Sequence, residues 1–389
     1  VVDCSQILAG PFCSMNLADM GAKVIKVEKP NGGDDTRSWG PPFKNNQSIG
    51  FMNLNRNKES IVINFKDPQG IQIMKKLVNK ADVLIENYRT GTMERLGLGY
   101  EDLKKVNKNL IYCSISGFGQ TGPKSELPGY DFMIQAMGGI MSVTGDPEGT
   151  PMKVGVGIAD VMCGMYAAVS ILSAIYHRDN GGSGQYIDLA LLDTQASWLI
   201  NSGLNYLTSL QDQNRMGNAH PNIVPYQVFE TSDSYFVLAI GNNSQFVKFC
   251  DMAGLGKLSK DVRFKNNADR VFNRELLVPL INDSTKKHTT KYWLDGLKKI
   301  QVPCGPVNTV KEVFEDPQIK HREMEISMNH NLSGTNKVNL IGSPVRMSST
   351  PVNYRYAPPT LGEHTEEILE EFLDLDEYER KDLVDKGIV

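Results

Sequence analysis

The sequence lacks the motifs and long apolar runs that mark several large classes of protein. The first glycine-containing turn, Ala9-Gly10-Pro11, is not a G-x-G-x-x-G fingerprint, and no G-x-x-x-x-G-K-[ST] loop follows it, so neither a dinucleotide nor a P-loop nucleotide is indicated. A G-x-S-x-G elbow is missing, which argues against a serine hydrolase. No uninterrupted run of about 18 apolar residues occurs. The stretch from Val161 to Tyr176 comes closest, and we predict a buried core helix there.

Charge and cysteine content exclude further classes. The 389 residues carry 41 basic and 45 acidic side chains, a net charge of -4, without a basic block that would indicate nucleic-acid binding. The 6 cysteines lie far apart, which argues against a zinc site or a disulfide scaffold and favours a reducing compartment. The chain begins without methionine, so a natural start and a targeting peptide can have been removed. We expect an intracellular location, either the cytoplasm or the mitochondrial matrix, and no bound metal.

The first half of the chain alternates short β-branched runs with helical stretches, which is typical of an α/β protein with an open, mostly parallel sheet. The expected strands are Val1–Leu8, Lys23–Val27, Ser60–Phe65, Val83–Glu86, Leu110–Ile115 and Gln185–Leu189. The expected helices are Phe12–Met20, a helix opened by Asp67-Pro68, Tyr100–Val106, a helix from Asp160 to His177, and Leu191–Leu210.

The stretch Gln211–Pro221 is more polar than the residues before it and predicts a domain boundary. Residues 222–320 then carry their own strands and helices, which indicates a smaller α+β domain. After it, Asn331–Ser343 is predicted to be extended and Thr365–Phe372 helical. The chain is therefore expected to contain a large and a small domain.

Basic residues gather at loops that follow the first strands, where ligands of open α/β sheets bind. A phosphate-rich ligand could be held there, although for any single residue a solvated surface position is the simpler interpretation. These residues are Lys26, Lys29, Arg37, Arg56, Lys58 and Lys66.

Asp160 lies between a glycine-rich segment, Val154–Ile158, expected to be a strand, and the apolar helix that follows. Locally it has two interpretations. Aspartate is among the best N-cap residues, so it can serve only to cap the helix. The same helix N-terminus would also keep a carboxylate ionised and nucleophilic. The residues around it leave both open.

A series of short motifs follows one another along the chain. The motifs are Leu8-Ala9-Gly10-Pro11, Gly21-Ala22-Lys23-Val24-Ile25-Lys26-Val27-Glu28, Gly33-Asp34-Asp35-Thr36-Arg37, Asn55-Arg56-Asn57-Lys58, Glu86-Asn87-Tyr88, Gly117-Phe118-Gly119-Gln120-Thr121-Gly122-Pro123, Gly157-Ile158-Ala159-Asp160 and Gly184-Gln185-Tyr186-Ile187-Asp188. Taken together and in order, they resemble the class III CoA-transferase family, which includes formyl-CoA transferase and CaiB-like proteins. The likeness extends from the first residue to Leu361-Gly362-Glu363-His364.

The resemblance implies a CoA-transferase in which Asp160 is the catalytic nucleophile and an acyl-CoA is the co-substrate. It implies a Rossmann-like large domain (residues 1–190, completed by 346–389), linkers at 191–221 and 321–345, a small domain at 222–320, and an interlocked homodimer. By matching positions, it also assigns residues that contact CoA. These are Leu8, Ala9, Lys29, Arg37, Ile63, Lys66, Asn87, Tyr88, Arg89, Arg95, Tyr130 and Asp131.

In the small domain, Gly241, Asn242 and Asn243 occupy the place of a glycine-rich lid loop, with asparagines replacing two glycines. The segment His220–Gln227 and the lid look most like family members that pass CoA from succinyl-CoA to dicarboxylic acids such as glutarate. Arg215 and His220 are candidate partners for a second substrate carboxylate.

Two alternatives stay open at this point. The family also contains α-methylacyl-CoA racemases, which use a histidine as a base where this chain has Tyr130. A nicotinamide-dependent oxidoreductase is the alternative from another class, supported only by the αβ alternation. Neither nucleic acid nor a membrane is expected as a partner.

Overall fold

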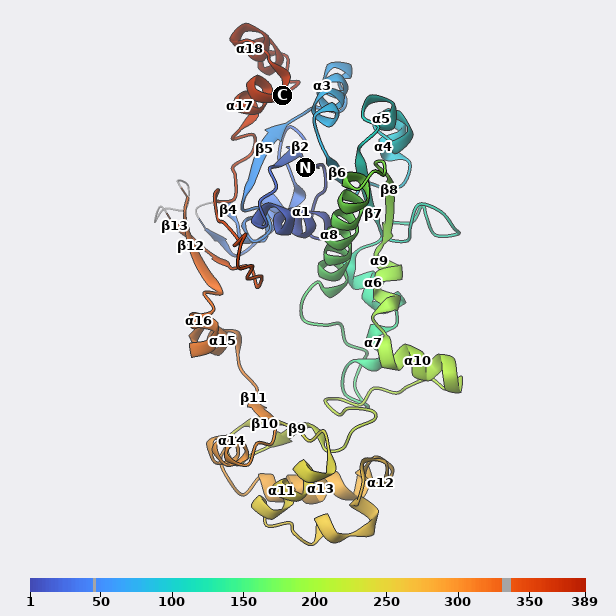
Figure 1. The fold of residues 1–389 in the computed structure, drawn as a ribbon, viewed down its shortest axis with the longest axis vertical. Helices are drawn as coiled ribbons and strands as arrows, with labels where there is room; N and C mark the ends of the chain where they lie inside the picture. Colours follow the sequence, from blue (N-terminus) through green and yellow to red (C-terminus); the bar gives the residue numbers. More distant parts are fainter. Residues whose placement is uncertain (45–46, 331–336) are drawn as a thin grey trace. The chain divides into compact units, whose positions relative to one another are not determined.

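The computed structural model describes residues 1–44, 47–330 and 337–389, which form two compact units (Figure 1). The larger unit comprises residues 1–140, 153–210 and 317–389. The smaller unit comprises residues 141–152 and 211–316. The chain thus leaves the larger unit twice and returns to it twice.

The larger unit is built on a six-stranded sheet in which every neighbouring pair of strands is parallel. This confirms the predicted α/β class. The strand order is β5-β2-β1-β6-β7-β8. The strands are β1 (Val2–Asp3), β2 (Val24–Glu28), β5 (Lys58–Val62), β6 (Val83–Glu86), β7 (Ile111–Ser116) and β8 (Tyr186–Ala190).

The strand order creates a switch point between β1 and β6. From β1 the chain continues to β2 on one side, whereas from β6 it continues to β7 on the other side. In open α/β sheets, ligands bind beyond the carboxyl ends of the strands at such a point, because the loops there diverge and leave a crevice. A ligand site is therefore expected at the loops that follow β1 and β6.

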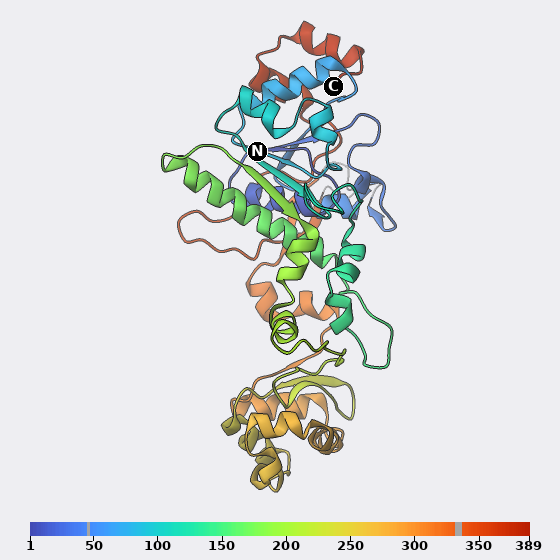
Figure 2. The same cartoon turned by 90° about the vertical axis from the view of Figure 1, so that its right-hand side faces the viewer.

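Helices cover both faces of the sheet. One apolar cluster joins the sheet to α1 (Ala9–Asp19) and α8 (Ile158–Asp179), and Figure 2 shows α8 crossing that face. A second cluster joins the opposite face to α3 (Pro68–Asn79), α5 (Tyr100–Val106) and α17 (Thr365–Leu373). The C-terminal segment thus completes the core of the larger unit.

The smaller unit has its own core around a three-stranded antiparallel sheet, in the order β11-β10-β9. Trp293 lies fully buried in this core, stacks on Phe236, and donates its indole N–H to the carbonyl of Thr285 at 2.8 Å. The elements of this unit are β9 (Tyr226–Glu230), β10 (Tyr235–Ala239), β11 (Cys304–Pro306), α11 (Asn243–Met252), α12 (Asn267–Phe272), α13 (Arg274–Thr285), α14 (Thr290–Lys299) and α15 (Val310–Glu315).

Shorter elements connect these parts. They are β3 (Phe43–Lys44), β4 (Gln47–Ser48), α2 (Ile49–Met52), α4 (Thr92–Arg95), α6 (Asp131–Met137), α7 (Ile140–Val143), α9 (Leu191–Ser197), α10 (Ile200–Ser209), α16 (Pro317–His321), β12 (Glu325–Asn329), β13 (Lys337–Ile341) and α18 (Glu377–Asp385).

Three sequence-based predictions of local structure are wrong. The first strand is only Val2–Asp3, because the chain bends away from the sheet to form the loop before α1. The segment Val154–Ile158 is no strand, since the buried amide of Gln135 accepts its backbone hydrogen bond at Val154. The expected helix Leu191–Leu210 is divided at Ile200, whose φ of 40° cannot continue a helix. Of the predicted extended stretch Asn331–Ser343, residues 331–336 lie outside the described residues.

Helix α8 is long and apolar enough to cross a membrane by length and composition. Such a single helix is weak support for a membrane span, because the core helix of a soluble protein passes the same test. Here Cys163, Ala167 and Ile171 of α8 are fully buried against the sheet. The prediction of a buried core helix over Val161–Tyr176 is thus confirmed for the face of α8 that packs on the sheet, whereas Val169 and Tyr176 on the same helix are exposed.

Candidate active site

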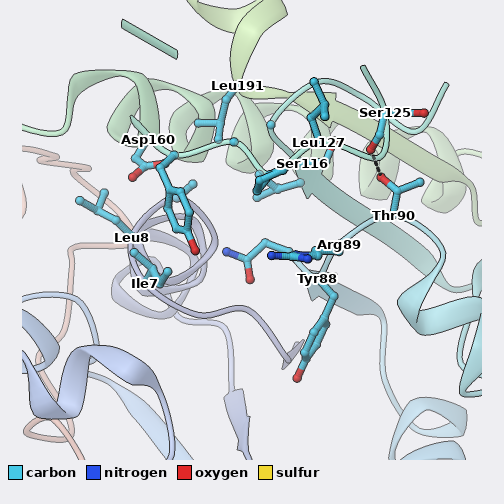
Figure 3. A pocket seen from close by; sticks show the side chains of 17 residues that line it. Ile7, Leu8, Tyr88, Arg89, Thr90, Ser116, Ser125, Leu127, Asp160 and Leu191 are labelled. Carbon is cyan, nitrogen blue, oxygen red and sulfur yellow. Dashed lines mark hydrogen bonds between the residues drawn. The ribbon is translucent and has the colours of Figure 1, made fainter. Parts of the chain in front are cut away.

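A pocket of about 150 Å³ opens at the switch point of the larger unit. Its wall combines the loop after β1 with the loop after β6, the end of β7, and the start of α8. Figure 3 shows Asp160 and Leu8 on one side of it and Thr90 and Ser125 on the other. The lining residues are Ile7, Leu8, Ala9, Asn87, Tyr88, Arg89, Thr90, Ile115, Ser116, Gly117, Ser125, Leu127, Pro128, Gly129, Tyr130, Asp160 and Leu191.

Close backbone contacts at glycines bring these segments together. A Cβ atom at Gly164 of α8 would lie 2.5 Å from the carbonyl oxygen of Ala9, so glycine is required where α8 packs on the start of α1. A Cβ atom at Gly117 would lie 2.5 Å from the Cα atom of Gly129. These contacts place α8 beside the start of α1 and the loop before α6 beside the end of β7.

The loop after β1 is held in an unusual backbone conformation. Ile7 has a φ of 72°, a left-handed value that is a real outlier for a β-branched residue. On one side the amide side chain of Asn87 accepts from the backbone N–H of Gln6 at 2.8 Å and donates to its carbonyl at 2.7 Å. On the other side the backbone N–H of Ile7 donates to the carboxylate of Asp34 at 3.3 Å. Two elements of the unit therefore fix this part of the pocket wall.

Replacing Asn87 with alanine is expected to destabilise the protein by about 1–3 kcal/mol, because the N–H and C=O of Gln6 lose their partners while Ile7 keeps its strain. The measurement is the free energy of unfolding in urea. The matched control is Asn109→Ala, at an exposed asparagine. Equal stability of the two variants would show that the Asn87 clamp contributes nothing to the fold.

Asp160 is the third residue of α8 and lines the pocket, but it is not the N-cap, so that interpretation is wrong. The N-cap is Gly157. The expectation that the helix N-terminus keeps this carboxylate readily ionised is also wrong. Burial raises the pKa of Asp160, and the nearby negative charge of Asp131 raises it further, to about 7. Asp160 is therefore a basic carboxylate that changes charge near neutral pH.

The basic cluster predicted near the strand ends mostly points into the protein. Lys26 and Lys58 are fully buried and pair with Asp34 at 2.9 Å and Asp3 at 3.2 Å, respectively. Arg56 pairs with Asp19 in the same buried manner, at 2.6 Å. The backbone carbonyls of Ser5 and Pro11 accept further hydrogen bonds from the two lysines. Lys26 and Lys58 thus support the loop after β1 and the start of α1, and none of these three buried side chains forms a phosphate-binding surface.

Arg37 and Ile63, two of the assigned CoA contacts, also have structural surroundings. Arg37 makes a bidentate pair with Glu28 at 2.6 and 2.7 Å and donates to the carbonyl of Pro359. Its donors are thus already taken. The side chain of Ile63 is 1% exposed in the core between the sheet and α3, so it cannot line an open pocket.

The structure divides the other assigned contacts into two groups. Leu8, Ala9, Asn87, Tyr88, Arg89 and Tyr130 line the pocket with Asp160. Lys29, Lys66 and Arg95 are exposed outside its wall, Lys29 in an ion pair with Asp35 at 2.5 Å and Arg95 donating to Thr92 at 2.9 Å. Asp131 does not line the pocket and instead accepts backbone hydrogen bonds from the first turn of α8.

The assigned lid residues begin a helix in the smaller unit. Asn242 is the N-cap of α11, and its side chain accepts from the backbone N–H of Gln245 at 2.9 Å. The side chain of Gln245 in turn accepts from the backbone N–H of Gly241 at 2.8 Å, and Asn243 is the first residue of the helix. Of the two asparagines that replace lid glycines, Asn242 thus caps the helix and Asn243 begins it.

The two candidate partners for a substrate carboxylate also lie in the smaller unit. Arg215 donates to the carbonyls of Asp146 and Gly149 at 3.0 and 2.6 Å, which fixes the loop between them. The ring of His220 accepts from the backbone N–H of Asn222 at 3.0 Å. Both side chains therefore stabilise loops of their own unit.

Sequence reasoning missed several residues of the wall. Thr90 donates to the carbonyl of Ser125 at 2.8 Å and so joins the two loops shown in Figure 3.

The stretch Gly117–Gly122 does have G-x-G-x-x-G spacing. It follows β7, however, and the next helix starts only at Asp131, so the helix N-terminus that would hold a pyrophosphate is missing at this stretch. Within the described residues, no group of three or more His, Cys, Asp or Glu could hold a metal ion.

Comparison with known proteins gives a consistent result. The sequence pattern of CoA-transferase family III matches residues 1–365. The chain is 42% identical over 389 residues to a succinyl-CoA:glutarate CoA-transferase of Mus musculus, covering 100% of this chain and 89% of the relative. It is 43% identical over 377 residues to a succinate–glutarate CoA-transferase of Agrobacterium fabrum, covering 95% and 94%. A crystal structure of a CaiB/BaiF family protein from Brucella suis superposes with a TM-score of 0.85 at 46% identity, covering 95% of this chain and 97% of that one.

Proposed function

The chain belongs to CoA-transferase family III and is an enzyme that transfers CoA, and from this premise we propose that it moves CoA from succinyl-CoA to glutarate. The observation that carries the proposal is the position of Asp160. This basic carboxylate stands in the wall of the switch-point pocket, beside the loops that the family resemblance assigns to CoA. The relatives from Mus musculus and Agrobacterium fabrum, at 42% and 43% identity, are by name CoA-transferases for the pair of succinyl-CoA or succinate and glutarate.

In the proposed mechanism, Asp160 forms two covalent intermediates. Its carboxylate oxygen attacks the thioester carbonyl of succinyl-CoA, the C–S bond breaks, and a mixed aspartyl–succinyl anhydride and CoA thiolate result. The thiolate then attacks the aspartyl carbonyl, which releases succinate and leaves an aspartyl–CoA thioester. Glutarate attacks this thioester to form a second anhydride and thiolate. The thiolate finally captures the glutaryl carbonyl, which gives glutaryl-CoA and restores Asp160.

Side chains of the pocket fit these steps. The apolar residues Leu8, Ala9 and Leu191 flank Asp160 and limit access of water that would hydrolyse an anhydride. Arg89 is exposed and brings a cationic group to the same wall, where it can face a phosphate or a substrate carboxylate. Since one thioester replaces another, the reaction requires no ATP.

A racemase is the alternative within the family. Proton removal next to a thioester would need a second base beside Asp160, and Tyr130, which stands where the racemases have their histidine, lines the same pocket. A tyrosine is a poor base near neutral pH. This observation favours transfer over racemisation.

The decisive experiment is to trap the intermediate. Incubation with succinyl-CoA followed by hydroxylamine or borohydride is expected to modify Asp160, as mapped by mass spectrometry of the digested protein. Asp102, a partly exposed aspartate of α5 that pairs with Lys105, serves as the internal control and should stay unmodified. Modification at another carboxylate would refute the mechanism.

The acceptor is tested separately with a panel of carboxylic acids. Glutarate is expected to give the highest kcat/KM with succinyl-CoA as donor, above oxalate and above monocarboxylic acids of similar length. Racemisation of a 2-methylacyl-CoA without transfer would support the alternative. CoA, but not NAD, is expected to raise the thermal unfolding temperature.

We also propose that the enzyme is an interlocked homodimer. Helix α10 supports this, because Ile200, Leu204 and Leu207 are 64–75% exposed along one helix. Helix α8 likewise exposes Val169 and Tyr176, at 57% and 72%. Apolar surface of this kind is usually covered by a partner.

A further inference from the structure

We propose that Asp131 is a positioning residue whose carboxylate caps the N-terminus of α8 from outside the helix and so holds and electrostatically tunes the nucleophile Asp160. The matching of family positions had assigned Asp131 to CoA instead. The inference deepens the proposed function and rests on Asp160 being the nucleophile.

The geometry around the first turn of α8 carries the proposal. The residue at the N-cap is Gly157, which has no side chain to accept a hydrogen bond. The backbone N–H groups of Ala159 and Asp160 donate instead to one carboxylate oxygen of Asp131, at 2.8 and 3.3 Å. A helix leaves its first N–H groups without intrahelical partners, so Asp131 performs the work of a cap for the turn that contains the nucleophile.

A buried glutamine fixes the orientation of Asp131. The side-chain N–H of Gln135, one turn further along α6, donates to the other carboxylate oxygen of Asp131 at 2.7 Å. Gln135 is fully buried, and its amide oxygen accepts from the backbone N–H of Val154 at 2.8 Å. Both oxygens of Asp131 are thus engaged, and the same glutamine holds the chain segment that leads into α8.

This arrangement explains why Asp160 is a strong base at a helix N-terminus. The positive end of a helix normally stabilises a nearby carboxylate. Here Asp131 occupies two of the N–H groups and adds a negative charge, while the pocket limits hydration of Asp160. Of the other ionisable groups, Cys163 lies on the same helix as Asp160, and Tyr88, Arg89 and Tyr130 line the same pocket.

A basic carboxylate suits a nucleophile that must attack a thioester near neutral pH. Nucleophilic strength rises with basicity, whereas the fraction ionised falls, so a pKa near the working pH is favourable. Two carboxylates with different environments can divide these tasks. Asp131 stays a structural acceptor, and Asp160 reacts.

The test compares Asp131→Asn with Asp131→Ala. Asparagine keeps an oxygen that accepts from the two N–H groups, but it removes the charge and the second oxygen, which accepts from Gln135. We expect the acidic limb of the kcat/KM profile for succinyl-CoA to move about one pH unit lower in Asp131→Asn, with KM within about twofold of the wild type. Alanine removes the cap as well and should lower kcat at least about tenfold at similar KM. Asp102→Asn, at a partly exposed helix position outside the pocket wall, should leave the profile unchanged.

A second measurement makes the result independent of turnover. Carbodiimide reacts with protonated carboxyl groups, so labelling of Asp160, mapped by mass spectrometry, falls as pH rises through its pKa. In Asp131→Asn this fall should occur at lower pH, even if Asp160 were not the nucleophile. The inference would be overturned if neither the labelling curve nor the kinetic profile moved. A KM raised tenfold or more with an unmoved profile would instead show that Asp131 contacts CoA.

Discussion

Replacing Asp160 with asparagine is expected to lower kcat for CoA transfer by at least about a thousandfold. The amide cannot attack the thioester, and no other carboxylate among the described lining residues of the pocket can take its place. The affinity for CoA should change little, because the loops after β1 and β6 are untouched. The measurements are single-turnover transfer and CoA binding by calorimetry. A loss of less than tenfold would show that another group is the nucleophile.

The same variant should be more stable than the wild type at pH 8. Since the pKa of Asp160 is raised to about 7 in the folded protein, its favourable contribution is complete below pH 4 and is lost as pH rises through 7. Asparagine removes the cost of the buried charge, on the order of 1–2 kcal/mol after allowance for partial solvent exposure.

The gain in stability should be smaller at pH 5 and should disappear only below about pH 4, where Asp160 is protonated in both the folded and the unfolded wild type. Thermal unfolding at the two pH values gives the comparison, with Asp102→Asn as the control. A variant that unfolds more easily at pH 8 would mean that Asp160 supports the start of α8, as its N-cap interpretation had required.

Replacing Lys58 with methionine is expected to destabilise the protein by about 3–5 kcal/mol. Lys58 is fully buried, and its ammonium group donates to Asp3 at 3.2 Å, to the carbonyl of Pro11 at 3.0 Å and to Asn55 at 2.8 Å. Methionine fills a similar volume but leaves the carboxylate of Asp3 buried without its nearest positive charge. The free energy of unfolding in urea at pH 7 measures the effect.

The pH dependence of this variant should also change. Burial alone would raise the pKa of Asp3, but the charges of Lys58 and Lys26 and hydrogen bonds from Ser14 and Ser5 outweigh it and lower the pKa to about 2. Asp3 therefore stabilises the wild type above pH 4, and this contribution is lost as pH falls towards 2. Lys58→Met should lose most of this contribution of Asp3, so its stability should depend less on pH between about 2 and 4.

Two variants serve as controls for Lys58. Lys80→Met breaks an exposed pair with Asp374, 3.3 Å long, and should cost no more than about 0.5 kcal/mol. Asp3→Asn combined with Lys58→Met removes both buried charges and should be more stable than the sum of the single effects predicts. If Lys58→Met and Lys80→Met were equally stable, the buried pair would contribute no more to the free energy of unfolding than the exposed pair.

Much of the fold could be predicted from the sequence because strands and helices of a parallel sheet have strong local signals. The strand Val83–Glu86 and the helix Tyr100–Val106 match their predicted bounds, and Asp67-Pro68 opens α3 as expected. The predictions failed where tertiary contacts override local preference. Ile7 would not be placed in a left-handed conformation from its residue type, and only the clamp by Asn87 and Asp34 holds it there.

The nature of the basic cluster was likewise decided by the tertiary structure. A lysine that follows a strand can face solvent, a phosphate or a buried carboxylate, and its sequence neighbours do not distinguish these cases. Lys26 and Lys58 pair with acids that lie 8 and 55 residues away. Their burial depends on the packing of α1 over β1, which no local pattern records.

The sequence by itself determined the fold class, the family and the identity of the candidate nucleophile. This was possible because each motif, and each predicted strand or helix, consists of residues that are contiguous in the chain. The pKa of the Asp160 carboxyl group was decided by the tertiary structure alone. Its base strength near neutral pH comes from burial and from Asp131, 29 residues earlier in the chain. Electrostatic environment depends on distance in space and on exclusion of water, and both exist only after the chain has folded.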